Sequence, residues 1–229
     1  KRVNKKTIQY GFVSTGNFNE KTAKIYGDYC LMTSNRAIMA DINKVFAAIR
    51  KPIEDISLLT QKTGKGLIVC PNQMRETMMS YIDTEIIEAL AGRKAHIIIK
   101  VNSLSNKEMI KKIYEAAKAG VKVEMIIRSI YCATNQKAFD KPIYAISIVD
   151  EYLEHARVMY FYNKGENSIY ISSADLSFRN MHKRIEYMLK VSENGAKKIK
   201  SYIDNMPINN NYYYEKISTG DDYMWIEKK

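Results

Sequence analysis

The stretch Ser168–Asp175 reads SIYISSAD, an apolar, strand-like run that ends in two serines, an alanine and an acid. A similar stretch lies near the start of the chain, where QYGFV leads into Ser14–Asn17 (STGN). In each copy a polar loop follows, and then a second strand-like run that opens with an acid, Asp28 or Glu186. The offset between the two acids is 158 residues, the same as that between the two motifs. A constant offset indicates two copies of one structural unit.

Apolar runs of strand length surround this repeat, and their near-continuous Ile, Val and Tyr content predicts strands covered on both faces. They are GLIVC (66–70), HIIIKV (96–101), VKVEMIIR (121–128), RVMYFY (157–162), SIYIS (168–172) and RIEYMLKV (184–191). The second copy of the unit is therefore complete. The first is present only as its last strands and one helix.

Helical patterns separate these strands, with apolar residues three and four apart. We expect helices over residues 36–49, 72–91, 105–119 and about 193–202. Ser105, three residues before Glu108, predicts a capping box, and Gly92 and Gly120 mark helix ends. Strands alternating with helices predict a layered α/β fold with helices on both faces of the sheet.

The polar, turn-rich residues 54–65 suggest a boundary near residue 60, which divides the chain into 1–60 and 61–229. The tail from Pro207 is rich in Asn and Tyr without a clear period, and we expect it to be irregular.

The most promising reactive pair stands just ahead of SSAD, at His155 and Arg157. Residues two apart on a strand face the same side, so a proton carrier and a fixed cation would point together. The alternative is a solvated strand start. Moving His155 back by the repeat offset gives a position a few residues before Lys1, so we expect the partner histidine to lie outside this chain. His96 and His182 are interpreted as a packed edge residue and a solvated loop residue.

A second candidate is Arg128, at the carboxyl end of a strand, where open α/β sheets bind ligands. The loop of residues 17–26 adds Asn, Lys and Tyr side chains. The sequence contains no P-loop, no G-x-G-x-x-G, no serine nucleophile elbow and no metal-type ligand spacing. Any nucleotide would therefore be held by Arg, Lys and Tyr side chains and by the backbone. The alternative for Arg128 is an ordinary cation at the end of a strand.

The composition sets the class of partner. With 229 residues, 46% hydrophobic and 27% charged, the chain can bury a core and is neither disordered, collagen-like nor coiled-coil. The formal net charge of +11 favours a polyanion: nucleic acid, a phosphate-rich ligand or an anionic membrane surface. A solvated basic surface is the alternative. No apolar run could span a membrane, no signal peptide is visible, and a first residue of Lys suggests a processed product or fragment. Cys30, Cys70 and Cys132 suggest a reducing compartment and small buried residues.

Two long blocks resemble the long-chain polyphosphate kinases. STGNFNEKTAKIYGDYCLMT resembles that family's G-T-G-N-[FY]-N-x-x-T-A-x-x-Y-T-D block. SIVDEYLEHARVMYFYNKGENSIYISSADLSFRNMHKRIE resembles its S-I-V-D-R-[FY]-L-E-H-x-R block with S-S-A-D-W-M-x-R-N-x-x-x-R-x-E. VNSLSNKEMIKKIYEAAKAGVKVEMIIRSIYC resembles the segment between them, so the resemblance reaches about residue 205.

The resemblance implies tandem phospholipase D-like α/β units, here the end of the third of four domains and the whole fourth. It implies reversible transfer of the terminal phosphate of ATP to polyphosphate through a phosphohistidine in an upstream H-x-K. The implied partners are ATP or ADP, inorganic polyphosphate, the N-terminal domains of the same chain and further copies of it, with no nucleic acid. Mg²⁺ would accompany ATP, with its ligands outside this chain. The implied location is the cytoplasm, with the inner face of the membrane as a possible peripheral site.

The resemblance also assigns roles to residues of the expected cleft between the two units. Tyr26 falls on the tyrosine that contacts the nucleotide, and Arg128 on the arginine that contacts phosphate. His155 falls on a histidine proposed as acid or base, and Arg157 replaces the superfamily lysine. The remaining matches are Asn17 and Asp175, on polar positions after the small-residue pair, and Arg179 and Asn180, on the family's R-N.

The chain also departs from the family pattern. Residues 129–135 (SIYCATN) replace Gly-Met-Cys and a proline-containing loop, Leu176-Ser177 replaces Trp-Met, and Gly27 replaces Thr. These changes leave two other interpretations open. One is a polyanion-binding paralogue that has lost catalysis, and the other, weaker one is a phospholipase D-like phosphodiesterase, which H-x-R in place of H-x-K disfavours.

Overall fold

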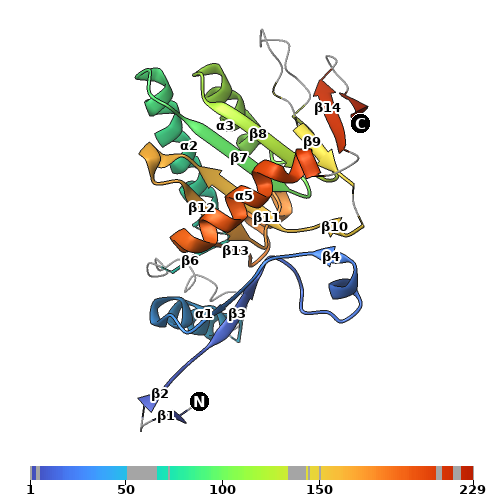
Figure 1. Cartoon of the computed structure of the whole chain (residues 1–229). Helices are drawn as coiled ribbons and strands as arrows, with labels where there is room; N and C mark the ends of the chain where they lie inside the picture. The colour runs from blue at the N-terminus through green and yellow to red at the C-terminus, as the bar shows by residue number, and fades with distance from the viewer. Residues whose placement is uncertain are drawn as a thin grey trace.

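The computed structural model describes residues 2–3, 6–50, 66–71, 73–133, 143, 145–149, 151–209, 213–218 and 223–228. Its centre is a mixed sheet of nine described strands, drawn from blue-green to red in Figure 1. Their order across the sheet is β15, β14, β9, β8, β7, β11, β12, β13, β6. Strands β7, β8 and β9 run parallel, and the other neighbouring pairs are antiparallel.

These nine strands span the following residues: β6 Leu67–Val69, β7 His96–Val101, β8 Lys122–Ile127, β9 Ala145–Ile148, β11 Arg157–Phe161, β12 Ser168–Ser172, β13 Tyr187–Lys190, β14 Tyr213–Ser218 and β15 Tyr223–Lys228. The six expected strands are confirmed, and β7 keeps the expected bounds. All six residues of β7 are buried, because helices cover both faces of the sheet.

One face of the sheet packs against α2 (Met74–Leu90) and α3 (Lys107–Lys118). The other packs against α5 (Glu193–Asn209), which crosses the sheet on the near side in Figure 1. Ile97 and Ile99 belong to the first core and Ile98 to the second, as the alternation of side chains along a strand requires. The expected layered α/β fold is confirmed.

The first copy of the unit lies beside this sheet, drawn in blue in Figure 1. Its elements are β1 (Arg2–Val3), β2 (Lys6–Thr7), β3 (Gly11–Ser14), the short 3₁₀ helix η1 (Thr22–Lys24), β4 (Tyr26–Gly27), β5 (Cys30–Thr33) and α1 (Arg36–Ile49). Ser14 of β3 pairs with Cys30 of β5, as Ser172 of β12 pairs with Met188 of β13. Both pairs keep the offset of 158 residues, so the repeat is visible in the strand register.

Short elements complete the second copy. They are β10 (Leu153–Glu154), the 3₁₀ helix η3 (Asn163–Gly165) and α4 (Phe178–His182). Gly92 and Gly120 adopt φ values of +71° and +94° directly after α2 and α3, which confirms them as helix ends.

Three expectations are wrong. The tail is not irregular from Pro207, because α5 extends to Asn209 and β14 and β15 form a hairpin that pairs with β9. The aromatic and β-branched content of these strands outweighs the lack of a clear period. The N-cap of α3 is Asn106, not Ser105: its side chain accepts a hydrogen bond from the Met109 backbone N–H at 3.0 Å.

The third error concerns the cysteines. Cys70 is buried as expected, whereas Cys30 and Cys132 are exposed. Cys30 begins β5 of the two-stranded β3–β5 sheet, and Cys132 follows Tyr131, which forms an isolated bridge with Leu104. Residues 54–65 and the boundary near residue 60 lie outside the described residues, as do Thr134 and Asn135 of the altered loop.

Candidate functional site

The two copies meet at a short parallel bridge between β4 and β10, in which Tyr26 pairs with Leu153. Beyond it, the backbone N–H groups of His155 and Ala156 both donate to the carbonyl of Gly27, at 3.2 and 3.0 Å. Tyr26 and Asp28 are two residues apart on the same extended segment, so both side chains face His155. The bridge therefore brings residues of the first copy to the histidine of the second.

His155 is held from two directions by polar groups. Its Nδ1 lies 3.0 Å from both carboxylate oxygens of Asp28, and Arg157 Nη1 lies 3.0 Å from its Nε2. The same Nη1 lies 3.3 Å from Nδ1. An ionised carboxylate only accepts, so the contact with Asp28 assigns a proton to Nδ1. The Tyr26 ring lies 4.6 Å from the imidazole, centroid to centroid. The imidazole is therefore held between Asp28, Arg157 and the Tyr26 ring.

Asp28 is kept ionised by its neighbours. Burial alone would raise the pKa of Asp28, but hydrogen bonds from His155 and Thr15, together with the charge of Arg157, hold it below its ordinary value. The Thr15 hydroxyl donates to Oδ1 at 2.6 Å. A Cβ at position 16 would lie 2.0 Å from Oδ2, so Gly16 leaves the room that this carboxylate occupies. The ionised carboxylate of Asp28 therefore contacts Nδ1 of His155.

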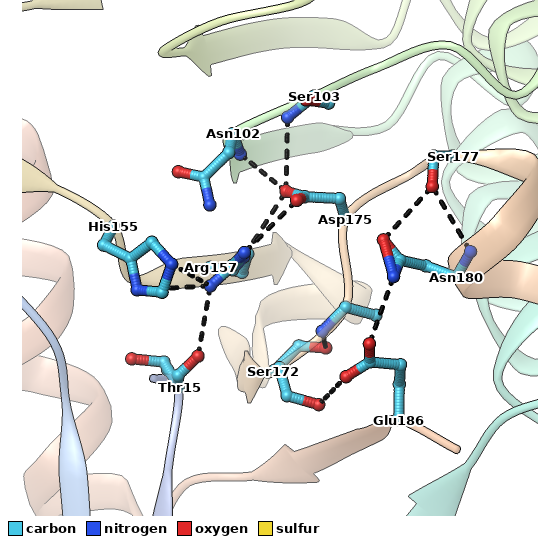
Figure 2. Close-up of polar contacts among 12 residues, drawn as sticks. Thr15, Asn102, Ser103, His155, Arg157, Ser172, Asp175, Ser177, Asn180 and Glu186 are labelled. Carbon is cyan, nitrogen blue, oxygen red and sulfur yellow. Dashed lines mark hydrogen bonds and ion pairs between the residues drawn. The ribbon is translucent and has the colours of Figure 1, made fainter. Parts of the chain in front are cut away.

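Arg157 forms the centre of the network in Figure 2. Its Nη2 and Nε donate to Asp175 at 3.2 and 3.4 Å, and its Nη1 donates to the Thr15 carbonyl at 3.2 Å. Asp175 also accepts the backbone N–H groups of Asn102 and Ser103, at 2.8 and 3.2 Å. The arginine, 9% exposed, is therefore locked between the two copies. The expectation that His155 and Arg157 point together agrees with this geometry.

Arg128 follows β8 at the same edge of the sheet. Its backbone N–H donates to Val101 at the end of β7, at 3.2 Å. The side chain is half-buried, and its Nη1 is buried without a hydrogen-bond partner among the described residues. Desolvation and the positive charge of Arg157 lower the pKa of Arg128. Arg128 therefore adds a second positive charge close to Arg157.

A buried lysine supports the strand that carries His155, and the sequence analysis missed it. Lys100, 2% exposed on β7, donates to the Ala156 carbonyl at 2.7 Å and pairs with Glu154 at 3.1 Å. Glu154 also accepts from the Tyr202 hydroxyl of α5 at 3.1 Å. Burial lowers the pKa of Lys100, against the opposing effect of Glu154. A single charge inside the apolar run HIIIKV was the available signal.

The remaining candidates divide into two groups. Asn180 is buried and donates to Glu186 at 3.1 Å, next to the hydrogen bond from Ser173 to that same carboxylate. Burial raises the pKa of Glu186 despite these bonds. Asn17 and Arg179 are exposed, and neither has a recorded side-chain contact to the His155 cluster. The structure therefore gathers Tyr26, Arg128, His155, Arg157 and Asp175, and leaves Asn17, Arg179 and Asn180 around them.

The departures from the family pattern are accommodated locally. Leu176 is fully buried and forms a bridge with Leu104, and the Ser177 hydroxyl caps α4 by accepting the Asn180 N–H at 3.3 Å. The two other histidines lie outside the cluster. His96 is 8% exposed and contacts Glu124, whereas His182, expected to be solvated, is half-buried and stacks on Phe178.

Two further features concern ions and membranes. Across the described ranges, no three His, Cys, Asp or Glu side chains lie close enough together to hold a metal ion. Asp28 and Asp175 are each already paired with a cationic or imidazole side chain. Helices in the described part of the chain are all too short or too polar to cross a membrane.

Comparison with known proteins matches two family descriptions along the chain. Residues 67–228 match "Polyphosphate kinase C-terminal domain 2", and residues 1–55 match "Polyphosphate kinase C-terminal domain 1". Polyphosphate kinase from Staphylococcus saprophyticus is 38% identical over 229 residues, covering 99% of this chain and 31% of that protein. The Vibrio vulnificus enzyme is 40% identical over 187 residues, covering 81% of this chain and 26% of that protein.

Among solved structures, the crystal structure of polyphosphate kinase from Porphyromonas gingivalis superposes with a TM-score of 0.83 at 30% identity. The match covers 95% of this chain and 33% of that one. Phosphatidylserine synthase from Haemophilus influenzae matches with a TM-score of 0.55 at 11% identity, over 89% of this chain and 60% of that one, which shows a shared fold alone. The chain thus spans about a quarter to a third of the length of its curated relatives.

Proposed function

This chain belongs to the polyphosphate kinase family, and we propose that it forms the C-terminal part of an enzyme that reversibly transfers the terminal phosphate of ATP to polyphosphate. The observation that carries the proposal is the cluster at the joint of the two copies. It combines His155, which is oriented by Asp28, with Arg157 and Arg128.

Phosphoryl transfer depends on positioning and on neutralising the charge of the transferring group. Arg157 is held by Asp175 and by the Thr15 carbonyl, so its orientation is set before a ligand binds. Arg128 has a buried N–H group without an acceptor in the described part of the chain. A phosphate between the two guanidinium groups would supply acceptors for both and bring no reorganisation of Arg157.

His155 is proposed as the proton carrier of the reaction. Its Nε2 is the ring nitrogen that does not face Asp28, and it would take a proton from, or return it to, an oxygen of the reacting phosphate. Asp28, held ionised, would stabilise the imidazolium that results. Tyr26 lies against the imidazole, and we propose that it flanks the nucleotide next to the reacting phosphate.

The phosphohistidine is assigned by the family resemblance to an H-x-K upstream of STGN, outside this chain. The repeat supports this assignment, since position 155 minus the offset precedes Lys1. Asn17 occupies the place in the first copy that Asp175 occupies in the second. We propose that Asn17 supports the cation of that upstream motif as Asp175 supports Arg157.

Magnesium is proposed to arrive with ATP. The described residues do not fit a magnesium site of their own, because Asp28 and Asp175 are already paired with His155 and Arg157. We assign its ligands to the nucleotide and to other parts of the enzyme.

Several wider properties are proposed from the same family membership. The chain would divide into the end of one phospholipase D-like unit, residues 1–60, and a complete second one, residues 61–229, in line with the two matched ranges. Its partners would be ATP or ADP, polyphosphate, the N-terminal domains and further copies of the enzyme. Its location would be the cytoplasm or the inner face of its membrane. Arg179 and Asn180 would support the site from α4.

The test is a chimera in which this chain replaces the matching residues of the Staphylococcus saprophyticus enzyme. Transfer of labelled terminal phosphate from ATP to polyphosphate is measured for the chimera and for His155→Ala. We expect that substitution to lower the rate by a factor of about 10² to 10⁴, the usual contribution of a positioned proton carrier. His182→Ala, outside the cluster, is the matched control and should retain the chimera's rate.

Each alternative has its own outcome. A normal rate for His155→Ala in an active chimera would refute the role of His155. A folded chimera that binds polyphosphate in a salt-sensitive way, without transfer, would favour the polyanion-binding interpretation. Cleavage of a phosphodiester substrate would favour the phosphodiesterase.

A further inference from the structure

Asn102 directly follows β7, next to Arg128, which directly follows β8. The two are neighbours across parallel strands: Ser129 N–H donates to the Asn102 carbonyl at 2.8 Å, one residue after Arg128 donates to Val101. Asn102 is only 4% exposed. Its Nδ2, like Nη1 of Arg128, is buried without a hydrogen-bond partner among the described residues.

Asn102 contacts Asp175 through its backbone N–H, so its side-chain amide is available to bind a ligand. The backbone N–H holds Asp175, and the carboxamide makes no bond to that carboxylate. Figure 2 shows the carboxamide on the His155 side of Asp175, above the Arg157 guanidinium. The amide donor therefore lies on the side of the Arg157 guanidinium, at the same edge of the sheet where Arg128 follows β8.

Buried donors without acceptors are rare, since more than nine in ten buried polar groups of native proteins are paired. Two such donors on adjacent strand ends, beside a locked arginine and an oriented imidazole, indicate an acceptor that binds from outside. Arg157 cannot serve Asn102, because a guanidinium has only donors. An acceptor that faces three donor groups at once is rich in oxygen and negatively charged.

We propose that Asn102 is a substrate-binding residue whose Nδ2 donates to a non-bridging oxygen of the phosphate held by Arg128 and Arg157. The inference rests on the proposed function, because it takes the ligand to be a phosphate or a polyphosphate chain. A neutral amide adds a directional donor without adding charge. It would therefore fix which oxygen of the phosphate faces β7, while the arginines supply the attraction.

The test measures binding of sodium tripolyphosphate to the full-length chimera described above by calorimetry, together with the thermal stability of the free protein. Asn102→Ala should weaken binding about tenfold, the usual loss for one hydrogen bond to a charged acceptor. Asn102→Asp, with nearly the same shape, should weaken it further, because it replaces a donor by a negative charge. The free Asn102→Ala protein should unfold at the same or a higher temperature, since the substitution removes an unpaired buried donor.

Asn106→Asp is the matched control. Asn106 is as buried as Asn102 but caps α3, a role that Asp also fills. Tripolyphosphate affinity should be unchanged in this variant. If the unsubstituted chimera binds and both Asn102 variants bind equally well, the role of Asn102 is overturned and the proposed function stands. If the unsubstituted chimera neither binds tripolyphosphate nor transfers phosphate, both are overturned. A loss of stability in Asn102→Ala with unchanged affinity would assign Asn102 to the fold instead.

Discussion

Thr15 and Ser173 make the same contacts in the two copies of the repeat, 158 residues apart. Each hydroxyl donates to an acid: Thr15 to Asp28 at 2.6 Å and Ser173 to Glu186 at 2.5 Å. Each also accepts the backbone N–H of the tyrosine that follows that acid, at 3.0 and 3.2 Å. The acids differ in their next contact, because Asp28 holds His155 of the other copy and Glu186 holds Asn180 of its own.

The pKa values of the two equivalent acids should be shifted in opposite directions. Carboxyl ¹³C NMR should place the pKa of Asp28 below 3.8, where His155, Thr15 and Arg157 hold it, and that of Glu186 above 4.5, where burial raises it. The Asp28 contribution to stability is then present above its unfolded pKa and lost as the pH falls through its folded pKa. The Glu186 contribution is present below its unfolded pKa and lost as the pH rises through its folded pKa. A shift of both pKa values in the same direction would contradict this assignment.

Removing one partner of the buried pair between Lys100 and Glu154 should be costly. Lys100→Met leaves a buried carboxylate without its partner and takes a donor from the Ala156 carbonyl, so we expect a loss of about 3 kcal/mol in the free energy of unfolding. Adding Glu154→Leu should recover most of that loss. Urea unfolding measures both variants.

A surface pair provides the control for this cycle. Lys197 and Glu193 form an exposed i,i+4 pair on α5. Lys197→Met should therefore change the stability by less than about 0.5 kcal/mol. A loss as large as that of Lys100→Met would mean that burial is not the cause.

The N-cap of α3 can be tested at two adjacent residues. Asn106→Ala should lower the free energy of unfolding by about 1 kcal/mol, because its side chain holds the Met109 N–H. Ser105→Ala should have little effect, since no cap bond comes from Ser105. Thermal unfolding of the two variants decides between them, and the reverse order would restore the capping box that the sequence suggested.

Binding of a phosphate chain should weaken as salt increases. The net charge of +11 and the two arginines of the site make the interaction largely electrostatic. Arg128→Met should lower tripolyphosphate affinity and reduce the slope of log K against log salt concentration by about one. Calorimetry at several salt concentrations measures both effects, and an unchanged slope would exclude Arg128 as a phosphate contact.

The three thiols should react at different rates. Cys30 and Cys132 are exposed, whereas Cys70 is fully buried and burial raises the pKa of its thiol to about 12. A thiol reagent at neutral pH should therefore modify two cysteines rapidly and the third only on unfolding. Mass spectrometry of the labelled peptides identifies them. Rapid labelling of all three would place Cys70 nearer the surface.

The strands were the most predictable part of the fold. HIIIKV becomes β7 with the expected bounds, because a buried strand needs an apolar run and little else. The repeat also predicted the shared register of β3–β5 and β12–β13. The hairpin of β14 and β15 was not predicted because these strands lack a clear period, and their pairing with β9 joins segments far apart in the sequence.

The site was predictable only where it is local. His155 and Arg157 meet as their spacing of two residues predicted, although His155 lies in the link between β10 and β11 and not in a strand. Asp175 follows from the repeat. Asp28 lies 127 residues from His155, and only the folded chain shows that they touch. Asn102 could not be predicted from the sequence, because it is singled out by a buried side-chain donor without a partner among the described residues, which only the folded structure reveals.

The bridge between β4 and β10 restricts how such a chain can be recombined with a relative. A crossover between residues 33 and 96 could join two well-folded copies and still pair Tyr26 and Asp28 of one parent with His155 of the other. Functional hybrids are therefore expected when residues 26–155 are inherited as one block. When such chains are recombined, residues 26–155 should be exchanged together, although this block includes parts of both copies.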